Sequence, residues 1–463
     1  MDSRIFILLL VPLVSGRSTE LGMELPDHLQ RMVRSENVAG FSLAHLHAVD
    51  TLTNEERGQS RRDIEAHGSD PSSDKHSFAL HLASGERLRM TLKRRSIDTS
   101  GATLTEVTED GKREVTQLRA ADCFFSGPLE GAEGYANLAM CDGELIGSVN
   151  TEKRYYEVHT LPEDTDKRSV DDVMRVLVTW QDAAHAQEGL MAGDETMKRR
   201  TLDELEPLEE DGLQISEEEE SEEESFEEDG AEIPEEEEES EDGGRRSISA
   251  RTVVIEIADY VDSHYLGDIK AKMGLITTGQ ITNLILNKWS SAAGVLGNRK
   301  QAGWDITLRL VALEIWRKNP SWYKTKASDS LVTRMHAICG NTKHLPYDQV
   351  TIHTGNPITP KAKGRVGLSW IGGVCRRRWR CTAVRGANTN FFTELHELGH
   401  SLGLRHENKM ANCASGSDPV RGFMGGNRDH LRSCYKKVLD ATFTNPKKSC
   451  VHHQDNSNTV KTF

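Results

Sequence analysis

The sequence predicts an α/β domain with a mostly parallel sheet, preceded by a β-rich module and a disordered acidic linker. Three observations lead to this prediction. The formal net charge of −16 hides one tract, Asp203–Asp242, that has 24 acidic residues and no Lys or Arg. After it, from Ser247 onward, strand-like and helix-like segments alternate, which is typical of parallel sheets. Before the tract, the pattern favours hairpins.

The chain begins with a segment that resembles a secretory signal. Ile5–Val14 is an apolar run too short to cross a bilayer, with Arg4 before it and the small residues Ser15 and Gly16 after it. We therefore predict a signal peptide over residues 1–16 and a secreted, extracellular product without a membrane span. A buried N-terminal strand is the alternative reading.

Residues 17–201 form the predicted β-rich module. His76–Leu82 and Glu86–Leu92 alternate as two strands around the turn Ser84-Gly85. Eight cysteines suit an oxidising compartment. Cys123 and Cys141 precede the acidic tract, so they can pair with each other. The six cysteines after the tract allow fifteen disulfide connectivities, and their number alone does not decide among them. They are Cys339, Cys375, Cys381, Cys413, Cys434 and Cys450.

Residues 202–246 form the predicted linker, because so acidic a segment cannot bury enough apolar surface to fold. It ends at the dibasic pair Arg245-Arg246, a candidate processing site. Lys198-Arg199-Arg200 is a second candidate, so activation after Arg246 or after Arg200 stays open. The acidic tract either docks on the basic C-terminal domain and keeps it inactive, or serves as a solubilising spacer.

Residues 247–463 form the predicted α/β domain, with 31 basic and 15 acidic residues after Ser247. The predicted strands are Thr252–Tyr260, Ile306–Trp316, Tyr347–His353 and Val366–Ile371. The predicted helices include one with the apolar face Ile281, Leu284 and Ile285, and another over Asp329–Ile338. A further helix begins after a cap at Thr389 or Asn390 and runs to Leu402, where Gly403 is a stop signal.

That last helix contains the pattern H-E-x-x-H-x-x-G-x-x-H. His396 and His400 are four residues apart and project from one helical face, a spacing that suits two ligands of one Zn²⁺. Gly403 can turn the chain so that His406 reaches the same ion. Three imidazoles leave a fourth position for water, and Glu397 can accept its proton. The alternative is an amphipathic helix whose histidines lie on the surface and bind no metal.

This pattern is the zinc signature of metzincin endopeptidases, and residues 396–403 resemble most closely the reprolysin branch, the ADAM and ADAMTS relatives. Three further segments resemble landmarks of that catalytic domain in the right order. They are Asp305–Trp316, Tyr347–Gly355 and Gly367–Cys375. The first module resembles a reprolysin propeptide around Cys123–Gly127 and Cys141–Gly143.

The resemblance implies roles for further residues. Met424 would form the Met-turn, an apolar floor below the zinc site. Glu256 and Asp348 lie at or near positions where relatives bind calcium, which makes Ca²⁺ possible. The implied disulfides of the catalytic domain are Cys339–Cys381, Cys375–Cys450 and Cys413–Cys434. The chain departs from reprolysins at Glu407, where Asp is usual and astacins have Glu, so an astacin-like protease is a further reading.

The predicted function is that of a secreted zinc endopeptidase, made as a zymogen. Substrate would extend along Val366–Trp370, and Val420–Phe423 would shape the side-chain pocket. The propeptide has no cysteine after Cys141, so a cysteine switch is not expected. Arg376–Arg380 predicts a cationic loop for a heparin-like polyanion or acidic substrates, and a solvated loop is the alternative. Nucleic acid is not expected, and the oligomeric state is open. The competing function is an inactive secreted binding protein with a basic surface.

Overall fold

The structure is a computed structural model of the whole chain. It describes residues 27–34, 38–49, 75–119, 121–161, 173–182, 252–275, 277–297, 303–326, 329–355, 366–386, 390–410, 413, 422–425, 431–445 and 452–453. These residues belong to one compact unit. Among them, no helix combines the length and apolar character needed to cross a lipid bilayer. The predicted signal peptide and acidic linker lie outside the described residues.

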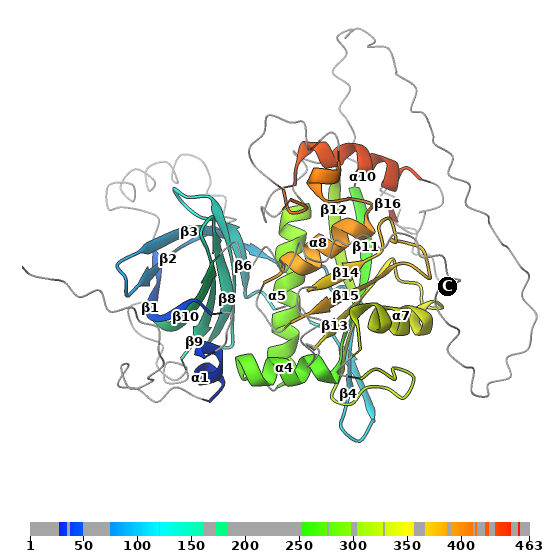
Figure 1. Cartoon of the computed structure of the whole chain (residues 1–463), viewed down its shortest axis with the longest axis horizontal. Coiled ribbons are helices and arrows are strands. Elements are labelled where there is room, and N and C mark those ends of the chain that lie inside the picture. The colour runs from blue at the N-terminus through cyan, green and yellow to red at the C-terminus, as the bar shows by residue number, and fades with distance from the viewer. Residues whose placement is uncertain are drawn as a thin grey trace, which may run out of the picture. The chain divides into compact units, whose positions relative to one another are not determined.

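The N-terminal module is a closed β-barrel with the strand order β1-β10-β9-β8-β7-β6-β3-β2 (Figure 1). Its strands are β1 (Gly40–Val49), β2 (Lys75–Leu82), β3 (Arg87–Arg95), β6 (Phe124–Pro128), β7 (Gly134–Cys141), β8 (Glu144–Thr151), β9 (Arg154–Thr160) and β10 (Val173–Asp182). A short helix, α1 (Asp27–Val33), packs Leu29 and Met32 on the outside of the barrel. The predicted β2–β3 hairpin is confirmed, with Gly85 in the left-handed region at φ +86°.

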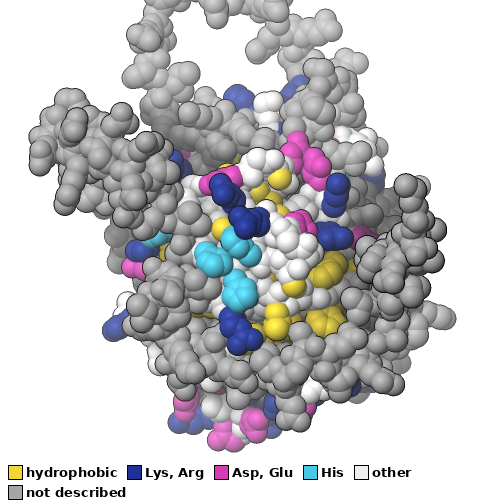
Figure 2. Space-filling model, turned by 90° about the vertical axis from the view of Figure 1, so that its left-hand side faces the viewer, with side chains coloured by type: hydrophobic (Ala, Val, Ile, Leu, Met, Phe, Trp, Pro, Cys, Tyr) yellow, Lys and Arg dark blue, Asp and Glu magenta, His cyan; other side chains and the backbone are white. Residues whose placement is uncertain are grey.

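Apolar side chains fill the barrel because alternate residues of each strand point inward. Leu80, Leu138 and Val176 are fully buried in this core. On the outside, Figure 2 shows histidine side chains gathered on one face with Lys and Arg side chains beside them. His47 of β1 and His81 of β2 lie on adjacent strands, with ring centroids 4.5 Å apart.

Two strands of the N-terminal half leave the barrel, which the sequence analysis did not predict. β4 (Thr103–Val107) and β5 (Arg113–Gln117) form an antiparallel hairpin between β3 and β6. β4 pairs in parallel with β12 (Asp305–Trp316), which belongs to the C-terminal domain. The hairpin therefore extends the sheet of that domain.

The C-terminal sheet has the strand order β14-β15-β13-β11-β12-β4-β5. Its remaining strands are β11 (Thr252–Val261), β13 (Gln349–Thr354), β14 (Gly367–Ser369), β15 (Cys381–Arg385) and β16 (His452–His453), which pairs antiparallel with β11. β11, β12, β13 and β15 run parallel, and β14 runs antiparallel to β15. The predicted mostly parallel sheet is thus confirmed.

Helices cover both faces of this sheet (Figure 1). They are α4 (Ser263–Met273), α5 (Thr278–Leu296), α7 (Leu331–Thr342), α8 (Phe392–Ser401) and α10 (Lys436–Phe443), with the 3₁₀ turns η6 (Glu407–Lys409) and η7 (Ser433–Tyr435). α5 and α8 share one core with β11 and β12, and α7 packs in another with β13. The predicted start of α7 at Asp329 was two residues early, because Ser330 caps the helix by accepting the Thr333 amide hydrogen.

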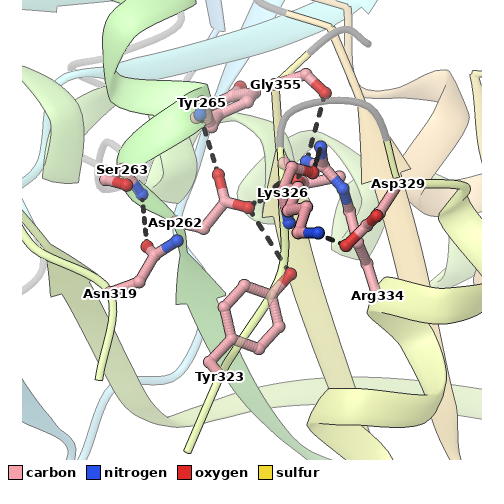
Figure 3. Close-up of polar contacts among 10 residues, drawn as sticks. Asp262, Ser263, Tyr265, Asn319, Tyr323, Lys326, Asp329, Arg334 and Gly355 are labelled. Atoms are coloured by element: carbon pink, nitrogen blue, oxygen red, sulfur yellow. Dashed lines mark hydrogen bonds and ion pairs between the residues drawn. The ribbon is translucent and has the colours of Figure 1, made fainter. Parts of the chain in front are cut away.

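A buried polar network joins the ends of β11 and β13 to α4 and α7 (Figure 3). Asp262 caps α4 by accepting the Tyr265 amide hydrogen at 2.8 Å, and its other oxygen accepts from Tyr323. Arg334 of α7 lies 3.5 Å from this carboxylate and donates to the Gly355 carbonyl oxygen. The network fixes the carboxyl end of β13, from which the chain continues towards β14.

Candidate metal centre

Helix α8 carries the H-E-x-x-H segment, and all ten of its residues are buried. The predicted cap at Thr389 or Asn390 was wrong, because Phe391 occupies the N-cap position and has no side-chain cap hydrogen bond. Asn390 lies one residue earlier, and its side-chain oxygen accepts the Phe392 amide hydrogen at 2.7 Å. The helix ends as predicted near Leu402, because Gly403 adopts φ +96°. The Leu404 amide then donates to the Gly399 carbonyl oxygen at 2.9 Å, so the chain turns back toward the helix.

This turn brings the three predicted histidines together. The ring centroids of His396, His400 and His406 lie 4.8 to 5.0 Å apart, and all three side chains are buried. One ligand atom from each lies within 4.8 Å of the others. In the part of the chain that the structure describes, this is the one such group of three metal-ligating side chains.

The hydrogen bonds of the rings suit metal binding. Nδ1 of His396 lies 3.1 Å from the Phe423 carbonyl oxygen, and Nδ1 of His400 lies 2.8 Å from that of Leu404. Because a carbonyl oxygen accepts a hydrogen bond, these contacts favour the tautomer with its hydrogen on Nδ1, which makes Nε2 the ligand atom of each ring. Nε2 of His396 and Nε2 of His406 face each other at 2.9 Å. Three converging neutral imidazole nitrogens are a donor set that fits Zn²⁺.

Glu397 follows the first histidine and lies against the start of β14. A Cβ atom added to Gly367 would collide with the Glu397 carboxylate. Gly367 therefore lets an edge strand run directly beside this carboxylate. The predicted substrate strand and the predicted base thus lie side by side.

Met424 lies directly below the helix, where the resemblance placed the Met-turn. It is fully buried, and a Cβ atom on Gly399 would collide with its sulfur and with the Phe423 ring. The absence of a side chain at Gly399 therefore allows close contact between helix and turn. Of the predicted pocket residues Val420–Phe423, Gly422 and Phe423 are described, whereas Val420 and Arg421 lie outside the described residues.

Glu407 holds this turn in place, a role that the sequence analysis did not predict. Its carboxylate accepts hydrogen bonds from the Gly422 amide at 2.6 Å and from the Tyr435 hydroxyl at 2.5 Å. Arg432 donates to its other oxygen at 3.0 Å. Burial, followed by the Glu407 charge, raises the pKa of Tyr435. The longer Glu side chain thus reaches the turn, Arg432 and Tyr435 at once.

A Glu407→Ala variant should lose both stability and activity. Removing this carboxylate breaks its buried ion pair with Arg432 and its hydrogen bonds with Gly422 and Tyr435, and removing one partner of a buried ion pair costs roughly 3–5 kcal/mol. Thermal unfolding and peptide cleavage measure the two losses. A Glu407→Asp variant is the control, because it keeps the charge. Unchanged unfolding of Glu407→Ala would contradict the role of Glu407.

A second buried cluster lies behind α8 and was also not predicted. Nζ of Lys288, on α5, lies 2.6 Å from Oε1 of Glu394, and both side chains are almost completely buried. His353 lies 3.7 Å from the same carboxylate and 3.0 Å from Asp259, which also accepts from Trp289. Burial alone would lower the pKa of Lys288, but the Glu394 carboxylate and the Tyr265 hydroxyl together outweigh burial and raise that pKa. The cluster joins α8 to α5, β11 and β13.

The cysteines pair as expected where the structure describes them. It joins Cys123 to Cys141, Cys339 to Cys381 and Cys413 to Cys434. Cys375 is also disulfide-bonded, and its implied partner, Cys450, lies outside the described residues.

The two candidate calcium ligands are neighbours. The Asp348 carboxylate accepts the Glu256 amide hydrogen at 2.8 Å, and the Glu256 carboxylate lies 3.4 Å from Arg309. Burial raises the pKa of Asp348 to about 7. Ca²⁺ takes six to eight oxygen ligands, and these two side chains supply only part of such a set.

The predicted cationic loop is only partly a surface feature. Arg376, Arg377 and Arg378 are exposed, but Arg380 is buried. Arg380 donates to the carbonyl oxygens of Thr342 and Leu345 at 2.7 Å. The prediction that all of Arg376–Arg380 is available to a polyanion was therefore wrong for Arg380, whose side chain instead forms hydrogen bonds at the end of α7.

Comparisons with known proteins match the domain that contains these residues. Residues 252–429 match the Reprolysin_5 family, described as metallo-peptidase family M12. A disintegrin and metalloproteinase with thrombospondin motifs 19 from Mus musculus is 30% identical over 227 residues, which cover 43% of this chain and 18% of that protein. A disintegrin and metalloproteinase with thrombospondin motifs adt-1 from Caenorhabditis elegans is 20% identical over 342 residues, which cover 69% of this chain and 22% of that protein. The chain spans less than a quarter of the length of these curated relatives.

Among solved structures, metalloproteinase-II from Bacteroides fragilis aligns with 83% of this chain and 95% of its own. The identity is 13% and the TM-score 0.38, which is too low to support an argument. The assignment therefore depends on the sequence match. That match confirms the predicted resemblance to reprolysins, and nothing in it favours the astacin-like reading of Glu407.

Proposed function

Since residues 252–429 form a reprolysin-type zinc metallopeptidase domain of family M12, we propose that this chain is a secreted endopeptidase that is made as a zymogen and hydrolyses peptide bonds of extracellular proteins. The observation that carries the proposal is the buried group of His396, His400 and His406 with Glu397 beside it. A binding protein that had lost catalysis would have no need to keep all four side chains.

The chain's own residues divide the work of hydrolysis. His396, His400 and His406 would hold Zn²⁺, and the carbonyl groups of Phe423 and Leu404 orient the rings of His396 and His400. When bound, zinc supplies Lewis acidity to the scissile carbonyl and to the attacking water. Glu397 accepts a proton from that water and delivers it to the leaving amine. Burial of the Glu397 carboxylate keeps this proton transfer away from bulk solvent.

The substrate would bind along β14, the edge of the sheet next to Glu397. An extended peptide can add to such an edge through backbone hydrogen bonds. Ser369 at the end of β14 contacts Ser401 of α8 at 2.7 Å, and the Gly372 amide donates to the His400 carbonyl oxygen. These bonds hold the substrate edge at a fixed distance from the zinc helix. Gly422 and Phe423 would contribute to the side-chain pocket.

The zymogen organisation is part of the proposal. Residues 1–16 would be removed as a signal peptide, residues 17–201 would be the propeptide, and residues 202–246 the acidic linker. The activating cut would fall after Arg200 or after Arg246. The charge contrast between the acidic tract and the domain over residues 247–463 supports this reading. Secretion is supported by the disulfides, which persist in oxidising compartments.

The test is cleavage of a denatured protein substrate by the processed chain. We expect cleavage at internal peptide bonds, loss of cleavage with a zinc chelator, and recovery when Zn²⁺ is added back. Mass spectrometry of the products would identify the bonds cut. A processed, folded chain that binds the substrate and leaves it intact in the presence of zinc would favour the inactive binding protein.

Calcium stays a prediction from the resemblance. If Glu256 and Asp348 bind Ca²⁺, millimolar calcium should raise the melting temperature of the wild-type chain, because an ion that binds only the folded state stabilises it. Asp348→Asn removes one charged ligand and should abolish that rise. Asp329→Asn, on the loop before α7, is the control. Equal melting temperatures with calcium and with chelator would end the calcium prediction.

Binding of a heparin-like polyanion is a weaker proposal, now limited to Arg376–Arg378. The three exposed guanidinium groups are adjacent in sequence and support electrostatic attraction to sulfate groups. Salt-sensitive retention on immobilised heparin, lost when the three arginines are replaced by Ser, is the expected result. Retention that survives this replacement would assign binding to another surface.

A further inference from the structure

We propose that the N-terminal module stays bound to the catalytic domain after the chain is cut between them, and that the β4–β5 hairpin on the edge of β12 holds it there. This inference rests on the zymogen organisation proposed above. Hydrolysis of the peptide bond after Arg200 or after Arg246 adds one water and leaves two chains. What happens next depends on the contacts that already join them.

The first of these contacts is a shared sheet. β4 pairs with β12 from Ala312↔Thr103 to Trp316↔Val107. The Arg317 amide donates to the Val107 carbonyl oxygen at 2.7 Å, just beyond the paired residues. On the other side, the Leu310 amide donates to the Asp98 carbonyl oxygen at 2.8 Å. Backbone pairing that extends past both ends of β4 resembles recognition by strand addition, in which backbone hydrogen bonds provide the affinity.

Apolar side chains on and beside the hairpin complete the cores of the catalytic domain. Val107 is 4% exposed and packs in the core that contains Tyr260 and Trp316. Ile97, Ala102 and Leu118 lie in the other core, together with α5. Loss of the module would expose these core faces and leave β12 as an unpaired edge strand. Release is therefore unfavourable even when the covalent link is broken.

Ion pairs fix the register of the hairpin. Three arginine–carboxylate pairs among the described residues join it, or the residues just before it, to the catalytic domain. They are Arg113–Glu314 at 2.6 Å, Arg317–Glu106 at 2.8 Å and Arg309–Asp98 at 2.7 Å. Both guanidinium nitrogens of Arg113 donate to the Glu314 carboxylate, and the second bond is 3.0 Å long. Such two-point bonds add geometric specificity to the pairing.

The barrel itself makes a second set of contacts. The rings of Tyr135 on β7 and Phe391, just before α8, have centroids 5.8 Å apart. Gln280 of α5 donates to the Glu144 carboxylate at 2.9 Å. The hairpin, however, lies at the end of the sheet opposite β14, the proposed substrate strand. The module is thus held at an edge that the substrate does not use.

The test uses the full-length chain with a recognition sequence for an added site-specific protease inserted between Gly244 and Arg245. Glu397→Gln is present throughout, so the result depends neither on zinc catalysis nor on native processing. After complete cutting, the wild-type hairpin should keep the two chains together in gel filtration. Replacing residues 103–117 by a short Gly-Ser turn should separate them. Separation of the wild-type chains after cutting would overturn the proposal.

A second experiment reverses the charges of the Arg113–Glu314 ion pair. It tests the proposal even if the chain without the hairpin does not fold. Arg113→Glu places two carboxylates together and should raise the dissociation constant of the cut chains about tenfold. Arg113→Glu with Glu314→Arg restores opposite charges and should recover most of the affinity. Lys112→Glu is the matched control, because among the described residues Lys112 forms its ion pair within the hairpin, with Glu114. Equal dissociation constants for wild type, Arg113→Glu and the control would also overturn the proposal.

Discussion

A Glu397→Gln variant of the processed chain should cleave protein substrates about 10²–10⁴-fold more slowly than wild type, which is the range that general acid–base catalysis contributes. The amide keeps the shape of the side chain next to Gly367 but cannot accept a proton. The three histidines are untouched, so zinc should bind as before. Single-turnover cleavage rates and zinc content, measured on the same preparation, check both halves of this expectation.

Asp305→Asn, at the start of β12, is the matched control, because it makes the same chemical change away from the zinc helix. It should cleave at nearly the wild-type rate. A Glu397→Gln chain that kept full activity would show that another group accepts the proton. A loss of zinc from that variant would instead show that Glu397 helps to hold the metal site together.

A Lys288→Met variant should lose about 3–5 kcal/mol of folding stability, because it leaves the Glu394 carboxylate buried without its cation. Nζ of Lys288 lies 2.6 Å from Oε1 of Glu394. Glu394 is two residues before His396 on α8, so the loss should also loosen the zinc helix. Denaturant unfolding gives the stability, and a competition titration with a chelator gives the zinc affinity.

The double variant Lys288→Met, Glu394→Met separates charge from packing. Replacing both partners of a buried pair by apolar side chains is often neutral, so much of the stability should return. Lys436→Met is the control, because its ion pair with Asp440 is exposed and such pairs contribute little. A Lys288→Met chain as stable as the control would contradict the role assigned to the cluster.

The zinc site could be predicted from the sequence because its information is local. The spacing of His396 and His400 follows from the helical repeat, and Gly403 supplies the left-handed conformation that returns the chain. The strands of the sheet were predictable for the same reason, since β11, β12 and β13 are continuous apolar or alternating runs. Local sequence patterns were sufficient to predict a feature wherever one helix, strand or turn contains all the residues that form it.

The features that were missed depend on contacts between distant segments. The β4–β5 hairpin has polar, exposed residues in β5, and nothing in that pattern shows that β4 pairs with β12, some two hundred residues later. Lys288 and Glu394 come from two helices, and a buried ion pair leaves no periodic signal. Glu407 was noticed as a departure from the family pattern, but its partners Arg432 and Tyr435 follow only from the folded chain.

The metal content of the purified chain tests the central claim most directly. The claim is that His396, His400 and His406 form one binding site for Zn²⁺. Mass spectrometric elemental analysis should find about one zinc per wild-type chain and much less in a folded His400→Ala chain. A correctly folded wild-type chain that takes up no zinc, even when zinc is supplied in excess, would contradict the account.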